Sequence, residues 1–222
     1  MRSPPRRVRR SPEEARRQIL DAALRLFADH GPDAVGLKDV AREARVSHAL
    51  VTHYFGTYDA LVESAFRVWS ERARADTIAR IAEIASGGPR AWVEHAGRQL
   101  EHPVYGRLAA WAMLSGRAFA DDFFMRKEQG FKKVADAIEM RLAFEGKKDV
   151  SRDEIELSMV LTLSALMGYT LARHSLWAGL GRTATAERDG AFRELLGDVI
   201  ESHVTLRRER AAREKKPRAK RR

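Results

Sequence analysis

The chain has 222 residues, of which 44% are hydrophobic and 32% charged, with a formal net charge of +10 and no cysteine. This apolar content is enough for the cores of one large or two small domains, and it excludes a disordered chain. Without cysteine there are no disulfides, thiolate metal sites or thiol nucleophiles, which fits a cytoplasmic protein. The basic N-terminus has no apolar segment after it, so we expect no secretory signal.

The positive charge is concentrated at the two ends of the chain. Residues 207–222 contain 10 Lys or Arg against 2 Asp or Glu, and residues 1–57 contain 11 against 7. The middle is nearly neutral. Basic ends attract phosphate backbones, although a solubilising tail explains the C-terminal run equally well. We therefore expect a disordered basic arm over residues 1–11 and a basic tail over 207–222.

The first helix is expected to begin at Pro12 and to end at His30. Ser11 is a good N-cap, and proline suits the first helical position. Gly31 and Pro32 end the helix in the usual way. One face of it is apolar at helical spacing. That face consists of Ile19, Leu20, Ala23, Leu26 and Phe27.

Residues 37–55 have the pattern of two short helices joined by a tight turn at Arg45 and Val46. Ser47 caps the second helix, and Val51 and Phe55 anchor it from below. Its outward positions are then Ser47, His48, Ala49, Thr52 and His53. A short helix with hydroxyls, small residues and imidazoles facing outward fits the DNA major groove, where it can touch base edges and phosphates.

Several motifs in this region resemble the tetracycline-repressor (TetR) family of regulators. Residues 17–31, RQILDAALRLFADHG, are similar to the family's first helix, and DVAREA at 39–44 to its second. Residues 46–55 resemble its recognition helix, and DAL at 59–61 the start of its fourth helix. The resemblance covers residues 16–69. It implies a helix-turn-helix DNA-binding domain over 12–57 and a helical ligand-binding and dimerisation domain over 58–206.

Three positions depart from the family's pattern. Arg45 stands at the turn where the family usually has glycine, and a left-handed arginine there costs about 1 kcal/mol. Gly36 replaces a threonine that caps the second helix, and Tyr58 replaces a lysine that contacts phosphate. A tyrosine hydroxyl can still bond a phosphate. The expected DNA contacts are Lys38, Arg42, Ser47, His48, Ala49, Thr52, His53, Tyr54 and Tyr58.

A metal site formed by His48 and His53 is the alternative reading of the two imidazoles. A spacing of five places them on different sides of a helix, and no third ligand is near in sequence. We therefore predict no metal and no cofactor. Phosphate loops and motifs of known catalytic sites are also missing from the sequence, so we predict that the protein is not an enzyme.

The rest of the chain shows only helical patterns, which predicts an all-α fold. We expect a long linking helix over 58–85, a break at residues 87–89, and further helices. These cover 90–101, 104–119, 121–145, 151–177 and 186–207. Residues 157–172 form the longest apolar-leaning run, and it is shorter than the roughly 20 residues a membrane span requires. It is expected to be a buried core helix, and no membrane partner is expected.

The last two helices are expected to form a homodimer through residues 151–177 and 186–207, as the resemblance implies. Small residues at four-residue spacing, Ser164, Gly168 and Ala172, permit close helix approach. An apolar stripe on the last helix is too long for one small domain to cover. It comprises Phe192, Leu195, Leu196, Val199 and Ile200.

A ligand pocket is expected in the C-terminal domain, which is rich in aromatic residues, methionine and histidine. Such side chains are usually ordinary core, but together they can hold an apolar ligand with a few polar anchors. The candidate ligand contacts are Trp111, Phe124, Met167 and His174. The sequence does not identify the small-molecule effector.

The favoured function is a ligand-responsive transcriptional regulator, in this family usually a repressor, that binds double-stranded DNA as a dimer. Two other functions remain open. One is a nucleic-acid-binding protein without sequence specificity that uses its basic termini. The other is an enzyme or small-molecule carrier with a vestigial DNA-reading segment.

Overall fold

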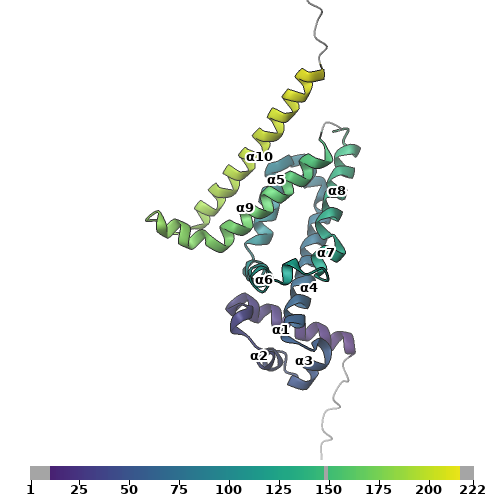
Figure 1. Cartoon of the computed structure of the whole chain (residues 1–222), viewed down its shortest axis with the longest axis vertical. Coiled ribbons are helices and arrows are strands. Elements are labelled where there is room, and N and C mark those ends of the chain that lie inside the picture. The colour runs from purple at the N-terminus through teal and green to yellow at the C-terminus, as the bar shows by residue number, and fades with distance from the viewer. Residues whose placement is uncertain (1–10, 148–149, 216–222) are drawn as a thin grey trace, which may run out of the picture. The chain divides into compact units, whose positions relative to one another are not determined.

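The computed structural model describes residues 11–147 and 150–215. Within these ranges the chain consists of helices joined by turns, without a strand, so the all-α prediction is confirmed (Figure 1). The predicted arm, apart from Ser11, and the last seven residues of the predicted tail lie outside the described residues.

The helices follow one another along the whole described chain. Two 3₁₀ turns, η1 (Pro32–Ala34) and η2 (Arg117–Phe119), interrupt them. The α-helices are α1 (Pro12–His30), α2 (Leu37–Glu43), α3 (His48–Phe55), α4 (Tyr58–Ala79), α5 (Ile81–Leu100), α6 (Pro103–Leu114), α7 (Phe124–Glu128), α8 (Gly130–Phe144), α9 (Arg152–Gly179) and α10 (Ala186–Lys215).

The described chain divides into two compact units. The N-terminal unit contains the chain up to Ser70 together with Pro103–Ala120, and the C-terminal unit contains Glu71–His102 and the chain from Asp121 onward. Helix α4 therefore contributes to both units, and α6 packs in the N-terminal one. The functional boundary expected at residue 57 stays a prediction.

In the N-terminal unit, α1 begins and ends as its sequence predicts. The Oγ of Ser11 accepts a hydrogen bond from the Glu14 N–H at 3.1 Å, and the Glu14 carboxylate accepts from the Ser11 N–H at 2.8 Å. Gly31 ends the helix with a φ of +80°. The predicted apolar face, apart from the half-buried Leu26, lies in the core, and α6 packs against this helix.

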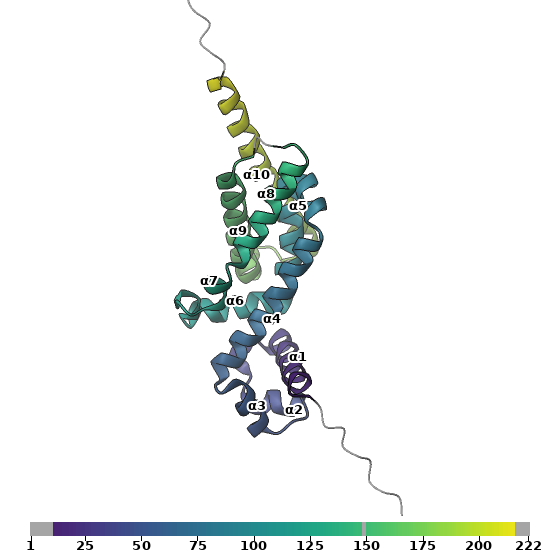
Figure 2. The same cartoon turned by 90° about the vertical axis from the view of Figure 1, so that its right-hand side faces the viewer.

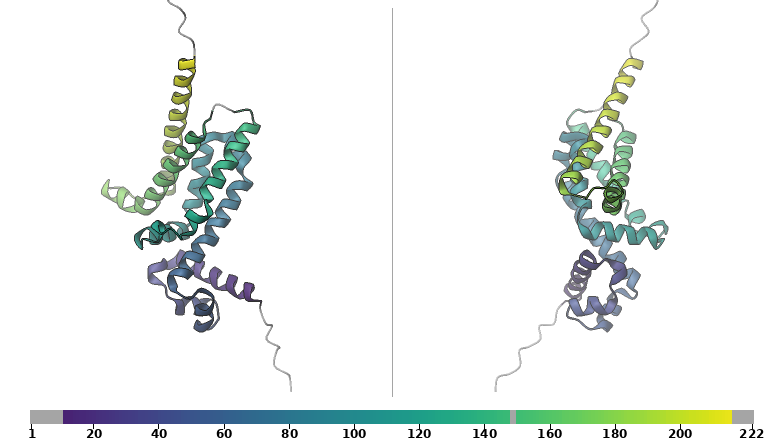
Figure 3. Two further views of the ribbon diagram at one scale, coloured as in Figure 1. Left: turned by 45° about the vertical axis from the view of Figure 1, so that its right-hand side comes forward. Right: turned by 90° about the vertical axis from the view of Figure 1, so that its left-hand side faces the viewer.

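In the C-terminal unit, α5 is the central helix. Helices α8, α9 and α10 all pack against it, and Figures 2 and 3 show α10 running alongside. Large side chains from the four helices form the core. They include Ile84, Trp92, Val93, Leu100, Val134, Ile138, Ile155, Met159, Leu166, Leu196 and Ile200.

Several predicted helix boundaries are wrong in this unit. The linking helix ends at Ala79 and not at residue 85, because the backbone at Arg80 is not helical. The break expected at residues 87–89 is confirmed, because Gly88, with a φ of +67°, interrupts the helical backbone of α5 at a kink there. Gln129, with a φ of +47°, divides the helix expected over 121–145 into α7 and α8.

The helix expected over 104–119 is also shorter, because α6 ends at Leu114. The last helix, in contrast, runs beyond residue 207 to Lys215. This extension is rich in Arg, Glu, Ala and Lys, which have high helix propensity. Strong local propensity therefore continues α10 past the end of its apolar pattern.

The expectation that residues 157–172 are buried is wrong for the single chain. Helix α9 buries only Ile155, Met159, Thr162 and Leu166. Its exposed apolar side chains are Leu157, Val160, Leu161, Leu171 and Leu176. Among the described residues, α9 alone is long and apolar enough to span a membrane by length and composition. Core helices of soluble proteins have the same length and composition.

The apolar stripe of α10 is divided between two faces. Leu196 and Ile200 are buried, in the helix that packs most extensively on α5. Leu195 and Val199 are instead more than half exposed. One edge of the stripe therefore packs in the core of its own unit, and the other edge is exposed.

Candidate nucleic-acid interface

Helix α2 and the turn after it are formed by local hydrogen bonds. The Gly36 N–H donates to the Asp39 carboxylate at 3.0 Å, which caps α2 without the missing hydroxyl. After α2 the Val46 N–H donates to the Ala41 carbonyl at 3.0 Å and closes the turn. Arg45 in this turn has a φ of +53°, so the left-handed conformation considered from the sequence is present.

Helix α3 is anchored by one face and exposed on the other. The Ser47 Oγ accepts from the Leu50 N–H at 3.1 Å and caps the helix. Val51 and Phe55 are buried beneath it. The predicted outward residues are all exposed, and they are Ser47, His48, Ala49, Thr52 and His53. This confirms their outward orientation, while contact with DNA stays a prediction.

The exposed face of α3 offers both donors and acceptors. Thr52 already donates its hydroxyl to the His48 carbonyl at 3.2 Å, so toward a ligand its oxygen serves as an acceptor. The ring of His53 lies edge-on to the half-buried ring of Tyr54, with centroids 5.3 Å apart. The two exposed imidazoles can donate or accept, which suits the hydrogen-bonding edges of bases.

The two acidic side chains of α2, Asp39 and Glu43, are both paired with arginines. Arg42 pairs with Asp39 at 3.1 Å, and Arg25 of α1 pairs with Glu43 at 3.0 Å. Lys38 is exposed and has no ion pair among the described residues. The segment from α2 to α3 therefore presents positive charge, as a phosphate-binding surface requires.

Tyr58 has a structural partner that the sequence did not reveal. Its hydroxyl donates to the carbonyl of Pro32, and its ring lies edge-on to Phe27 with centroids 6.4 Å apart. Burial raises the pKa of this hydroxyl, and nearby Asp33 and Asp59 raise it further. Because the hydroxyl has a single proton, the predicted phosphate contact would require the bond to Pro32 to break.

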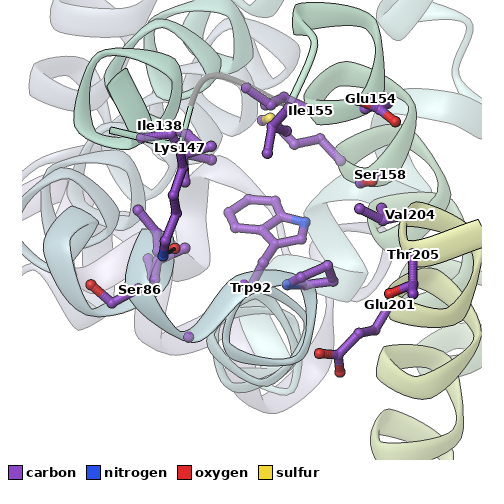
Figure 4. Close-up of a pocket in the computed structure, with 18 of the residues that line it drawn as sticks. Ser86, Trp92, Ile138, Lys147, Glu154, Ile155, Ser158, Glu201, Val204 and Thr205 are labelled. Carbon is purple, nitrogen blue, oxygen red and sulfur yellow. Dashed lines mark hydrogen bonds between the residues drawn. The ribbon is translucent and has the colours of Figure 1, made fainter. Parts of the chain in front are cut away.

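The C-terminal unit contains a separate cavity of about 260 Å³. It lies among α5, α8, α9 and α10, and the indole of Trp92 projects into its centre in Figure 4. Its apolar lining includes Ile138, Ile155, Met159 and Val204.

Polar side chains surround this apolar lining. They are Lys147, Glu154, Ser158, Glu201 and Thr205, among others. The buried Nε1 of Trp92 has no hydrogen-bond partner among the described residues, and it lies on the side of Ser158 in Figure 4. The cavity therefore combines an apolar lining with one buried hydrogen-bond donor, the Nε1–H of Trp92, that has no partner among the described residues.

The four ligand contacts expected from the sequence do not line this cavity. Trp111 is buried in the N-terminal unit, whereas the other three belong to the C-terminal unit. Phe124 is buried, Met167 half-buried and His174 exposed. Their role as ligand contacts remains a prediction. Sequence reasoning did not select Trp92 or Met159, although the Gly-Gly-Pro break just before Trp92 was visible and borders the cavity.

No group of three or more His, Asp or Glu side chains suited to a metal ion occurs among the described residues. The two histidines of α3 thus have no third ligand in this part of the chain. Their exposure on the helix surface leaves them available for a nucleic acid.

A capped two-helix motif with a tight turn, a buried anchor and an exposed second helix defines a helix-turn-helix protein. Residues 19–65 match the sequence profile described as bacterial regulatory proteins, tetR family. The chain is 36% identical over 99 residues to the HTH-type transcriptional regulator BetI of Agrobacterium fabrum, covering 43% of this chain and 47% of that protein.

A second relative is the HTH-type transcriptional repressor Rv3405c of Mycobacterium tuberculosis. It is 40% identical over 76 residues, which cover 31% of this chain and 40% of the relative. The chain thus matches less than half the length of these two curated relatives.

The similarity in fold extends further along the chain. A crystal structure of a putative transcriptional regulator from Saccharomonospora viridis in complex with choline matches with a TM-score of 0.60 and 23% identity. It covers 85% of this chain and 96% of the other. The predicted resemblance is confirmed for the N-terminal region, where residues 19–65 match the tetR-family model, and the fold of the described chain is similar to that of solved TetR-type regulators.

Proposed function

We propose that this protein is a ligand-responsive transcriptional regulator that binds a pseudo-palindromic DNA operator as a dimer. The observation that carries the proposal is helix α3, whose exposed polar face rests on the buried anchors Val51 and Phe55. Each protomer would place this helix in one major groove. Two such helices related by a two-fold axis read half-sites about 34–36 Å apart.

The dimer is supported by the apolar surface that α9 and α10 leave exposed. Leu157, Leu161, Leu195 and Val199 are each at least 47% exposed. On α9 the small residues Ser164 and Gly168 are also exposed, which permits a second helix to approach closely. We propose that the same surface of a second protomer covers these side chains, through 151–177 and 186–207. Burial of each large apolar side chain would contribute about 1.5–3 kcal/mol.

The cavity among α5, α8, α9 and α10 is the proposed effector site. Its apolar lining favours a compact ligand with an apolar body, and the free Nε1–H of Trp92 favours a hydrogen-bond acceptor on that ligand. The solved structure from Saccharomonospora viridis contains choline, which makes a small organic effector a reasonable class to test here. If the effector lowers DNA affinity, DNA must lower effector affinity by the same factor.

The first experiment is selection of operator sequences from random DNA with the full chain. We expect one enriched pseudo-palindrome, bound at least 1,000-fold more tightly than random DNA at fixed salt, as is typical of specific binding. A ratio near one would favour the alternative of a binder without sequence specificity. Truncations of residues 1–10 and 208–222 would then show which basic end contributes.

The effector site is tested by filling it. Ser158 is half-buried and lines the cavity, so Ser158→Phe would place a ring in the space. Compounds that raise the melting temperature of the natural chain should then lose their effect. Met140→Phe, at an exposed position on α8, is the matched control. Retained binding to Ser158→Phe would place the effector elsewhere.

A further inference from the structure

Arg45 occupies a backbone conformation that does not suit an arginine. Among the described residues, only Arg45 and Gln129 combine a side chain with a positive φ, at +53° and +47°. Glycine adopts this conformation without the steric penalty of a side chain. Strained positions of this kind persist where the rest of the structure holds them, and they are concentrated at functional sites.

The side chain of Arg45 also has no ion-pair partner among the described residues. It is exposed to solvent. Its neighbours differ, since Arg42 is held by Asp39 and Arg25 by Glu43. Because these two carboxylates are already engaged by other arginines, the guanidinium of Arg45 remains available for an external anion.

The position of Arg45 determines which anion it can meet. It lies in the turn between α2 and α3, two residues before the Ser47 cap. A side chain in this turn stands outside α3 and is therefore beside the helix that would enter the groove. Base edges are read from the helix itself, whereas its flanks meet the sugar-phosphate backbone. The planar guanidinium can bond a phosphate through two N–H groups.

We propose that Arg45 is a DNA-phosphate contact, and that the chain keeps a charged side chain in the left-handed turn because of it. This rests on the proposed DNA-binding function and adds a contact that sequence reasoning did not include. The backbone strain at Arg45 lowers the stability of the free protein, whereas its phosphate contact strengthens the complex with DNA. Removing the side chain relieves the turn and weakens the complex.

The test compares Arg45→Gly with the natural chain in two measurements. The melting temperature of the free protein should rise, because glycine relaxes the turn. The slope of log affinity for the selected operator against log salt should become shallower by about 0.9, which is the counterion release of one phosphate contact. That slope corresponds to roughly fivefold weaker binding at 0.15 M salt.

Three further variants separate charge from strain. Arg45→Asn keeps a residue that tolerates the left-handed region but removes the charge, and it should lose the same slope. Arg45→Lys keeps the charge and should retain most of it. Gln129→Gly relieves the other left-handed position, so it should raise the melting temperature and leave the slope unchanged.

The outcomes distinguish this inference from the function beneath it. If the natural chain binds no DNA, the proposed function and the Arg45 contact fail together. If it binds its operator and Arg45→Gly keeps the full slope, only the Arg45 contact is overturned. A melting temperature that rises while the slope falls supports the proposal, because a purely structural role does not change the salt dependence.

Discussion

The first 60 described residues and the last two helices differ in how far they bury their large apolar side chains. Between residues 11 and 70, every large apolar side chain is at least half-buried within the unit. Helices α9 and α10 instead leave a long row of such side chains exposed. These are Leu157, Val160, Leu161, Leu171, Leu176, Leu195, Val199 and Leu206. The first region buries its large apolar side chains in one chain, whereas the second leaves many of them exposed.

This difference corresponds to two kinds of recognition. The N-terminal region presents polar and cationic groups. Their exposure to water costs little free energy when no nucleic acid is bound. The helices α9 and α10 present apolar groups, and it is on this exposed apolar surface that we base the proposed dimer interface. Stability of the first region should therefore depend on its internal core, and stability of the second on protein concentration.

The largest expected effect of a single substitution is at Phe27. This side chain is fully buried in α1 and lies edge-on to the Tyr58 ring. Phe27→Ala should lower the free energy of unfolding of the N-terminal unit by about 3–5 kcal/mol, because it removes a large side chain and leaves a cavity. Thermal unfolding followed by circular dichroism measures it.

Leu195→Ala is the control for Phe27→Ala. This side chain is 62% exposed in the single chain, so its loss should barely change unfolding under conditions in which the protein is monomeric. Equal losses for the two variants at low protein concentration would show that the two regions do not differ in this way.

The N-terminal region was predictable because its signals are local. The Ser11 cap, the Gly31 stop and the anchors of α3 all depend on residues within a turn or two of one another. The internal partner of Tyr58 was not predictable, since its acceptor is the Pro32 carbonyl, 26 residues earlier. Any backbone carbonyl looks the same in sequence.

The C-terminal unit was less predictable for two physical reasons. The turn at Arg80 and the break at Gln129 occur at residues with no special turn preference, so tertiary packing decides them. The cavity, in turn, is assembled from four helices. Composition indicates that aromatic and methionine side chains are available there, but only the packing decides that Trp92 lines the space and Trp111 does not.

The next effect in size concerns the dimer. A charge at Leu195 should weaken association by at least 100-fold, or about 2.7 kcal/mol, because an unpaired carboxylate would be desolvated in the interface. Sedimentation velocity on Leu195→Asp at micromolar concentration should show monomers. The neighbouring Leu196 of the same stripe is unsuitable for this test, because it is buried in its own unit and a charge there would disrupt the core.

Met140→Asp is the matched control for the dimer variant. Met140 is 72% exposed on α8, outside the proposed interface, so the same charge should leave the dimer intact. A monomeric natural chain, or an unchanged dimer for Leu195→Asp, would contradict the assignment of α9 and α10 as the interface.

A smaller effect is expected for the exposed histidine near the end of α3. If His53 contacts a base, His53→Ala should cost about 1–3 kcal/mol on the selected operator and much less on random DNA. Competition binding at fixed salt measures both. His102→Ala, at an exposed position of the other unit outside the proposed dimer interface, should change neither. Equal losses on operator and random DNA would mean that His53 touches only phosphate.

The smallest expected effect is at Tyr58. Tyr58→Phe removes the donor to the Pro32 carbonyl, which should lower the free energy of unfolding by about 0.5–1.5 kcal/mol. The lower end of that range is expected because the Val35 N–H also donates to this carbonyl, at 3.3 Å, so the acceptor is not left alone. The slope of operator affinity against salt should stay unchanged, since the hydroxyl proton is committed inside the unit. A slope shallower by about 0.9, with stability unaltered, would show instead that Tyr58 leaves Pro32 and bonds a phosphate.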